Sequence, residues 1–160
     1  MLTQEQLKEL FHYSPETGIF TRLKTTTGKN KAGTIPGGDK STGYIRIAIN
    51  GKYYQAHRLA WLYMTGDFPK NCIDHINMIK TDNSWGNLRG ATRSENNKNR
   101  NAQSNNRLQL KNISKLSSGS YRVQVGSNGS YINKTFKKLE EAISYAKEMR
   151  DYYHKEFSRN

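Results

Sequence analysis

The chain has 160 residues, of which 34% are hydrophobic, and its formal net charge is +13. A mean hydropathy of −0.93 predicts small cores, and the length admits one or two small domains. The excess of cations, 26 Lys and Arg against 13 Asp and Glu, indicates a polyanionic partner: DNA, RNA or an anionic membrane. No apolar run approaches the roughly 20 residues of a membrane-spanning helix, so we expect no membrane partner. The single cysteine, Cys72, excludes a disulfide within the chain and a cysteine-built zinc site, and it fits a reducing cytoplasm.

The first 43 residues are predicted to form a short helix, a turn, a strand and a loop. A capping box at Thr3–Gln6 opens the helix, which places Leu7, Leu10 and Phe11 on one side. Residues 13–18 have turn composition, and residues 19–23 alternate as a short strand does. Residues 24–43 are rich in Thr, Gly and Lys, which is typical of a loop that is either solvated or in contact with phosphates.

A hairpin and a buried helix are predicted next. Residues 44–49 and 52–56 flank Asn50-Gly51, the pair that supplies the positive φ values of a two-residue turn. The apolar run Arg58–Met64 then predicts a helix that Gly66 ends.

The stretch from Ile73 to Asn96 contains the residues best suited to chemistry. Asp74 and His75 are adjacent, Asn87 follows 12 residues after the histidine, and Asn96 comes 9 residues later. A second capping box at Thr92–Glu95 places a helix start at Thr92. A neutral imidazole can accept a proton from water near pH 7, since its ordinary pKa is about 6.5. Oxygen donors such as the Asp74 carboxylate and the Asn96 amide suit Mg²⁺, which often uses only one or two protein side chains.

Together with Asp82-Asn83, Asn87-Leu88-Arg89 and the helix His57–Trp61, this stretch resembles the HNH endonucleases, in the Asn-terminated variety common in phage and mobile-element proteins. The resemblance departs from the commoner pattern at Ser84, where an Arg often stands, and at Gly90. It implies a ββα-metal nuclease domain over residues 1–100, with a helix and hairpin extension at its N-terminus.

The resemblance also implies a role for each residue of the motif. His75 would be the general base, and Asn87 would hold the loop and orient the histidine. Asp74 and Asn96 would bind one Mg²⁺ or Mn²⁺ per active site. Neighbours on a regular strand point to opposite faces, so the strand is expected to end or bend at Asp74 and His75.

Several further side chains are assigned from their surroundings. Arg89 is expected either to fix the loop through an ion pair or to contact a phosphate. His57 is expected to have a structural role, and His12 and His154 are expected on the surface. The residues expected to contact DNA near the motif are Arg89, Arg93, Lys98, Arg100 and Arg107.

The polar stretch 101–112 contains few apolar residues and is predicted to be a linker or an extended arm. Residues 113–160 follow as a second domain, with three antiparallel strands and one long amphipathic helix. This pattern resembles the AP2-type DNA-binding domain, which implies that Arg122, Gln124 and Lys134 face the DNA. Strict alternation would instead put Lys134 on the core side unless a bulge intervenes. The polar residues of this sheet could also be merely exposed to solvent.

The whole sequence therefore predicts an α+β, site-specific DNA endonuclease of HNH homing type, in which a C-terminal AP2-like domain recognises double-stranded DNA. One metal centre per chain implies a nick by each monomer, and a monomer or weak dimer without a small-molecule cofactor is expected. The resemblance places it in the cytoplasm of a bacterial host, encoded by a phage or mobile element. The alternatives are a non-catalytic DNA-binding protein with the same ancestry, and an RNA or structure-specific nuclease.

Overall fold

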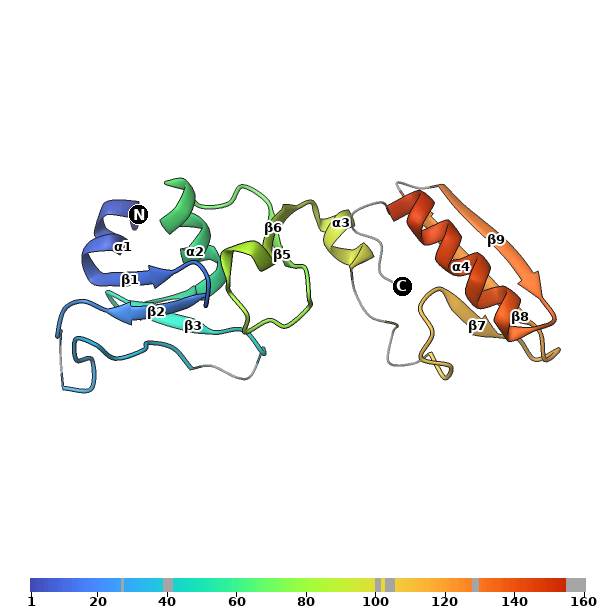
Figure 1. Ribbon diagram of the computed structural model, residues 1–160, viewed down its shortest axis with the longest axis horizontal. Coiled ribbons are helices and arrows are strands. Elements are labelled where there is room, and N and C mark those ends of the chain that lie inside the picture. Colours follow the sequence, from blue (N-terminus) through green and yellow to red (C-terminus); the bar gives the residue numbers. More distant parts are fainter. Residues whose placement is uncertain (27, 39–41, 100–101, 103–105, 128–129, 155–160) are drawn as a thin grey trace. The chain divides into compact units, whose positions relative to one another are not determined.

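The computed structural model of the protein describes all residues except 27, 39–41, 100–101, 103–105, 128–129 and 155–160. The chain forms two compact units, Met1–Ala91 and Thr92–Asn160, and both combine small antiparallel sheets with helices (Figure 1). The α+β class is as predicted. The functional division expected at residues 100 and 113 stays a prediction, because units of packing need not coincide with functional domains. Within the described part of the chain, no helix has the length and apolarity needed to cross a membrane.

The first unit begins with helix α1 (Gln4–Leu10), whose capping box at Thr3 is confirmed. Strands β1 (Phe11–Ser14) and β2 (Ile19–Arg22) then form a hairpin. Phe11 was expected on the helix, but its backbone is extended, with φ −139° and ψ 141°. Its ring is only 2% exposed. The free energy gained by burying this ring from an extended backbone favours ending the helix one residue earlier than predicted.

The predicted Asn-Gly hairpin is confirmed. Strands β3 (Arg46–Ile49) and β4 (Lys52–Gln55) pair in register, and the turn residues Asn50 and Gly51 have φ values of 49° and 74°. These positive values are those of a two-residue turn whose twist matches the strands. Helix α2 (Ala56–Thr65) follows directly and ends at Gly66 with φ 90°, as predicted.

The motif stretch folds as two strands joined by a long loop. Strand β5 (Cys72–His75) pairs antiparallel with β6 (Leu88–Ala91), with His75 opposite Leu88, and the short 3₁₀ turn η1 (Trp85–Asn87) leads into β6. Helix α3 (Arg93–Lys98) begins after Thr92, whose capping box is confirmed, and it opens the second unit. The strand ends at His75, as the chemistry required.

One hydrophobic core joins these elements of the first unit. Leu7 of α1, Tyr13 of β1, Ile47 of β3 and Leu59 and Leu62 of α2 are each 2% exposed or less. Ile73 and Leu88, from the paired strands β5 and β6, belong to the same cluster. The motif hairpin is therefore anchored to a packed scaffold through one apolar residue on each strand.

The second unit contains the predicted three strands and one helix. Strands β7 (Ile113–Lys115), β8 (Tyr121–Ser127) and β9 (Ser130–Phe136) form an antiparallel sheet, and helix α4 (Leu139–His154) packs on it. Its core is small, and the buried residues are Ile113, Val123, Val125, Ala142 and Ala146. The resemblance of this arrangement to AP2-type domains stays a prediction.

The expected extended arm is only partly described, and the described part is folded. Residues 106–112 turn rather than extend, and Leu108 and Leu110 pack against the core of the second unit. Asn106 Nδ2 donates to the carbonyl oxygens of Leu110 and Ile113, at 2.6 and 2.9 Å. The two leucines are partly buried, which the mostly polar composition of this stretch did not predict. Positions 101 and 103–105 lie outside the described residues.

The Gly18→Ala substitution is expected to destabilise the first unit by about 3 kcal/mol, because it adds a clash to an unfavourable backbone conformation. Gly18 has φ +71°, and a Cβ placed there would lie 2.2 Å from the backbone carbonyl carbon of Asn83. Gly119 has φ +82° with nothing within 4 Å of its Cβ position, so Gly119→Ala should cost only about 1–2 kcal/mol. Equal losses in urea unfolding would contradict the close approach of the first hairpin to Asn83.

Candidate active site

Asp74 lies near the end of β5 with its carboxylate buried against Arg89. Asp74 Oδ2 accepts a hydrogen bond from Arg89 Nε at 2.9 Å and forms an ion pair with Arg89 Nη2 at 2.8 Å. The two residues are opposite each other in the β5–β6 register, and Asp74 is 4% exposed. The ion pair expected as one alternative for Arg89 is therefore present. A contact between Arg89 and DNA stays a prediction.

His75, the last residue of β5, is buried and held by an asparagine. Its Nε2 lies 3.3 Å from Asn83 Oδ1, and Asn83 Nδ2 donates to the carbonyl oxygen of Thr81 at 3.2 Å. Because the amide nitrogen is bound to a carbonyl, the amide oxygen faces the imidazole and can only accept. The proton of the neutral ring is therefore on Nε2, and the lone pair is on Nδ1.

Asn83 is itself fixed by the first hairpin. It is 1% exposed, and its carbonyl oxygen accepts a hydrogen bond of 2.7 Å from the Tyr13 hydroxyl. Burial, with a smaller contribution from the charge of Asp82, raises the pKa of Tyr13 to about 12, so the phenol keeps the proton that it donates. Sequence reasoning gave no role to Asn83, because its partner lies 70 residues away along the chain.

Asn87 closes the loop between β5 and β6. Its Oδ1 accepts from the backbone nitrogen of Asn77 at 2.9 Å, and its Nδ2 donates to the carbonyl oxygen of Asp82 at 2.8 Å. Its own carbonyl oxygen accepts from the nitrogen of Ile76 at 2.9 Å. Asn87 thus joins both ends of the loop, while Asn83 forms the hydrogen bond to the imidazole. A role for Asn87 in catalysis stays a prediction.

Ser84, one of the departures from the family pattern, has a local partner in Asp82. Its Oγ donates to Asp82 Oδ1 at 2.7 Å and its backbone nitrogen donates at 3.1 Å. These two bonds lower the pKa of Asp82, and a further bond from Asn77 lowers it as well. A serine here gives the loop a turn-stabilising hydrogen bond, which a longer arginine side chain would not make in the same way.

Two aromatic rings contact the imidazole of His75. The ring centroid of His57, from α2, lies 5.1 Å away in an edge-to-face arrangement, and the ring of Tyr44 lies 5.9 Å away. The ammonium of Lys80 lies 4.8 Å from the Tyr44 ring. His57 was expected to be structural, and its proximity to His75 was missed. Neither residue is near position 75 in the sequence, so no local spacing could reveal the contact.

Both histidines are held neutral. Burial, with smaller contributions from His75 and Arg58, lowers the pKa of His57 to about 3. Burial also lowers the pKa of His75, although the Asn83 bond and the carboxylates of Asp74 and Asp82 oppose this shift. At neutral pH the ring of His75 is therefore uncharged, which is what a general base requires.

The metal site expected at Asp74 and Asn96 stays a prediction, because the two residues belong to different units. Among the described residues, no group of three or more His, Cys, Asp or Glu side chains could hold a metal. The expected ligands, Asp74 and Asn96, offer carboxylate and amide oxygens, which suit Mg²⁺ or Mn²⁺ completed by water and substrate phosphate. Asn96 lies on α3, half-buried, in the second unit.

Most of the other expected DNA contacts are exposed polar residues. Arg107 lies in a turn and Arg93 on α3, and both are exposed, while Lys98 is half-buried. Arg122 and Gln124 are exposed on β8, on the same face of the sheet. Arg100 lies outside the described residues. Contact of these side chains with DNA stays a prediction.

The structure decides the face of Lys134, which the sequence left open, and contradicts the surface position expected for His154. Lys134 pairs with Val123, which is fully buried, and its ammonium lies 4.7 Å from the ring of Tyr145 on α4. Strict alternation in β9, without a bulge, therefore places Lys134 on the helix side of the sheet, away from Arg122 and Gln124. His154, expected on the surface, is 5% exposed at the end of α4.

Comparison with known proteins identifies the motif segment. The family model described as HNH endonuclease matches residues 54–98, which contain α2, the β5–β6 hairpin and α3. No curated protein matches the chain. A solved structure entitled "DNA binding and cleavage by the HNH homing endonuclease I-HmuI" is similar over 84% of this chain and 76% of that chain, at 23% identity and a TM-score of 0.44.

The free energy of unfolding is expected to depend on pH through His57. The folded pKa of about 3 lies below the unfolded value of about 6.5, so the unfolded state binds an extra proton between these values. The stabilisation is complete above about pH 6.5 and is lost as the pH falls, at about 1.4 kcal/mol per pH unit. His57→Gln should make the free energy of unfolding, measured with urea, less dependent on pH than in wild type between about pH 6 and 4. His12→Gln, at an exposed position, should leave this dependence unchanged. Parallel profiles for wild type and His57→Gln would contradict this assignment.

Proposed function

We propose that the protein is a DNA endonuclease of the HNH type, which hydrolyses phosphodiester bonds with a divalent metal ion. The observation that carries the proposal is the neutral, oriented imidazole of His75 at the end of β5, with its Nε2 proton directed to Asn83. Further support comes from the family match over residues 54–98 and from the net charge of +13, which suits a polyanionic substrate.

The proposed reaction assigns one task to each group. His75 Nδ1 takes a proton from the attacking water, and Asn83 stabilises the imidazolium that results, because its Oδ1 accepts the Nε2 proton. The rings of His57 and Tyr44 restrict rotation of the imidazole. Asp74 and Asn96 would hold Mg²⁺ or Mn²⁺, which, when bound, supplies positive charge to the phosphate and the leaving oxygen. Asn87 keeps the loop closed around Asn83.

We further propose that the enzyme is a site-specific nuclease of homing type, encoded by a phage or mobile element. The second unit would supply recognition of double-stranded DNA through the exposed face of its sheet, where Arg122 and Gln124 lie. One metal centre per chain would cut one strand, so a monomer would nick DNA. A double-strand break would require a dimer or a second binding event.

One observation favours a second candidate, a DNA-binding protein that does not cleave. Asp74 Oδ2 accepts a hydrogen bond from Arg89 and forms an ion pair with it, and a carboxylate neutralised in this way is a weaker ligand for a cation. Such a protein would bind DNA with the affinity of the nuclease but would not cleave it.

His75→Ala is expected to reduce cleavage by a factor of about 10² or more while DNA affinity is unchanged, because only the general base is lost. The measurement is conversion of a supercoiled plasmid that carries DNA from the source replicon, with Mg²⁺, Mn²⁺ or EDTA. His12→Ala, at an exposed position on β1, is the matched control. Open circles that require metal would support a nickase, and linear product would indicate paired active sites.

Undiminished cutting by His75→Ala would exclude this histidine as the base. Tight binding of the cognate plasmid by wild type, without any conversion, would favour the DNA-binding candidate instead.

Arg122→Ala combined with Gln124→Ala is expected to weaken cognate binding and to relax site choice, at about 1–3 kcal/mol for each lost base contact. The measurement is the ratio of affinities for cognate and scrambled duplexes in EDTA. Lys147→Ala, at an exposed position on α4, should change the ratio little. An unchanged ratio in the double variant would reject recognition by the outer face of this sheet.

A further inference from the structure

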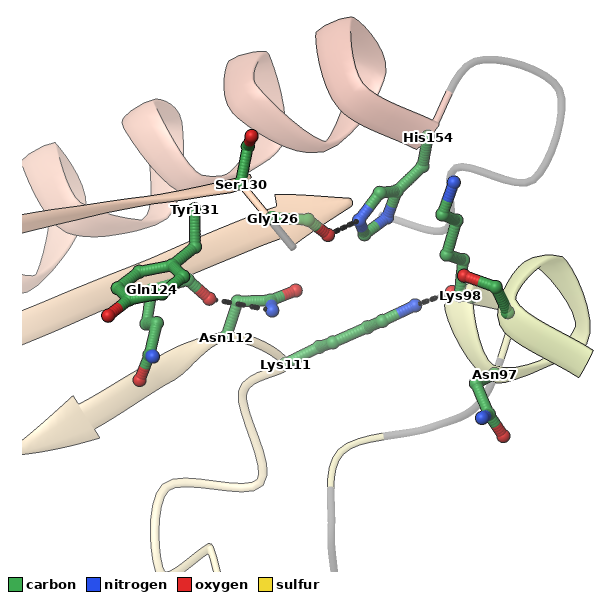
Figure 2. A pocket seen from close by; sticks show the side chains of 10 residues that line it. Asn97, Lys98, Lys111, Asn112, Gln124, Gly126, Ser130, Tyr131 and His154 are labelled. Atoms are coloured by element: carbon green, nitrogen blue, oxygen red, sulfur yellow. Dashed lines mark hydrogen bonds between the residues drawn. The ribbon is translucent and has the colours of Figure 1, made fainter. Parts of the chain in front are cut away.

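A cavity of about 410 Å³ lies within the second unit, and its lining includes none of the residues proposed for cleavage (Figure 2). Its walls come from α3, from the segment before β7, from β8 and β9, and from the last residue of α4. Two lysines, Lys98 and Lys111, line it, and no carboxylate does so among the described residues. The cavity therefore has a positive potential that favours an anion.

The positive side chains are held in place by the fold. The ammonium of Lys111 donates a hydrogen bond to the carbonyl oxygen of Lys98, so the end of α3 fixes one cation at the cavity (Figure 2). Arg150 Nη1 also donates to the carbonyl oxygen of Lys111 at 3.0 Å, and the charge of Asp151 acts on this guanidinium. The two lysines are therefore the cations that line the cavity itself, and a negative ligand there would be attracted to both.

His154 adds a buried polar group that lacks a partner. Its side chain is 95% buried, given an exposure of 5%, and Nε2 lies 3.1 Å from the carbonyl oxygen of Gly126. The other ring nitrogen, Nδ1, is buried and has no hydrogen-bond partner within the described part of the chain. The same holds for Oδ1 of Asn112, a second residue that lines the cavity. Buried polar atoms without partners are costly, so both atoms indicate a missing ligand.

We propose that this cavity binds a phosphate group through Lys98, Lys111 and His154. Two ammonium groups and a protonated Nδ1 would give three charge-assisted donors to the phosphate oxygens. A hydration water carried by the ligand would satisfy Asn112 Oδ1. The source of the phosphate is taken to be the DNA backbone, and in this respect the inference rests on the proposed function. A free phosphate compound has the same chemistry, and the two sources are distinguished below.

Binding of an anion should bring a proton to His154. Burial lowers the pKa of this imidazole, and so do the charges of Lys111, Lys98 and Arg150, which act on it from the segment before β7, from α3 and from α4. The hydrogen bond to Gly126 opposes the shift. An anion offsets the three cations and favours the imidazolium, so ligand binding and protonation should be coupled.

The first experiment measures binding of duplex DNA by full-length protein against KCl concentration, in EDTA and in a His75→Ala background. Lys98→Gln keeps the backbone carbonyl that Lys111 binds, so it removes one cation and preserves the fold. We define the salt slope as the slope of the logarithm of the binding constant against the logarithm of the salt concentration. For Lys98→Gln its magnitude should be smaller than that of the parent by about 0.9, the value for one phosphate contact. Lys147→Gln, at an exposed position on α4, should keep the parent slope.

The second experiment follows the His154 ring by NMR in the absence of DNA, with inorganic phosphate or with KCl at the same ionic strength. Phosphate should raise the pKa of His154 in the parent and much less in Lys98→Gln. This result together with a reduced salt slope assigns the site to backbone phosphate. The same result with an unchanged slope assigns the site to a free phosphate compound.

The proposal is overturned if inorganic phosphate leaves His154 unchanged and Lys98→Gln has the same salt slope as Lys147→Gln. If the parent fails to bind DNA at all, the proposed function fails, and the response of His154 to phosphate still decides whether the cavity is an anion site.

Discussion

The hydrogen bond between His75 and Asn83 is the interaction on which the candidate active site depends. It joins the end of β5 to the loop that returns to β6, and it decides which ring nitrogen carries the proton. Asn83 can hold the ring because Tyr13 binds its carbonyl oxygen, and Gly18 lets the first hairpin come close to its backbone. The N-terminal hairpin, which contributes no reacting group, therefore sets the tautomer of the proposed base.

Burial determines the electrostatics of both units, but with different results. In the first unit it keeps His57 and His75 neutral, and nearby carboxylates moderate the shift at His75. In the second unit it acts on His154 together with three cations and without a balancing carboxylate on the cavity wall. The first arrangement suits proton transfer, because a neutral imidazole can accept a proton from water. The second suits anion binding, because a negative ligand would relieve the unbalanced charge.

Local sequence rules determined the elements wherever the decisive contacts are short in range. Both capping boxes, the Asn50-Gly51 turn and the glycine end of α2 follow from backbone geometry within a few residues, and the structure has all of them. The helical position expected for Phe11 was wrong for the opposite reason, since burial against distant residues overrode local preference. Leu108 and Leu110 likewise pack on a core where the polar composition predicted a linker or an extended arm. Lys134 was left open by the sequence, and the β8–β9 register decided it.

For the site, the sequence by itself determined the reactive types and their order: a carboxylate beside a histidine, an asparagine before the second strand, and a capped helix after it. Only the tertiary structure decided the environment of the base. His57, Tyr44 and Asn83 meet His75 from α2, from the segment before β3 and from the loop. Spacing along the chain determines which residues share a strand or a turn. The partners of a buried ring depend instead on how separate elements pack, because packing brings together residues that no local pattern connects.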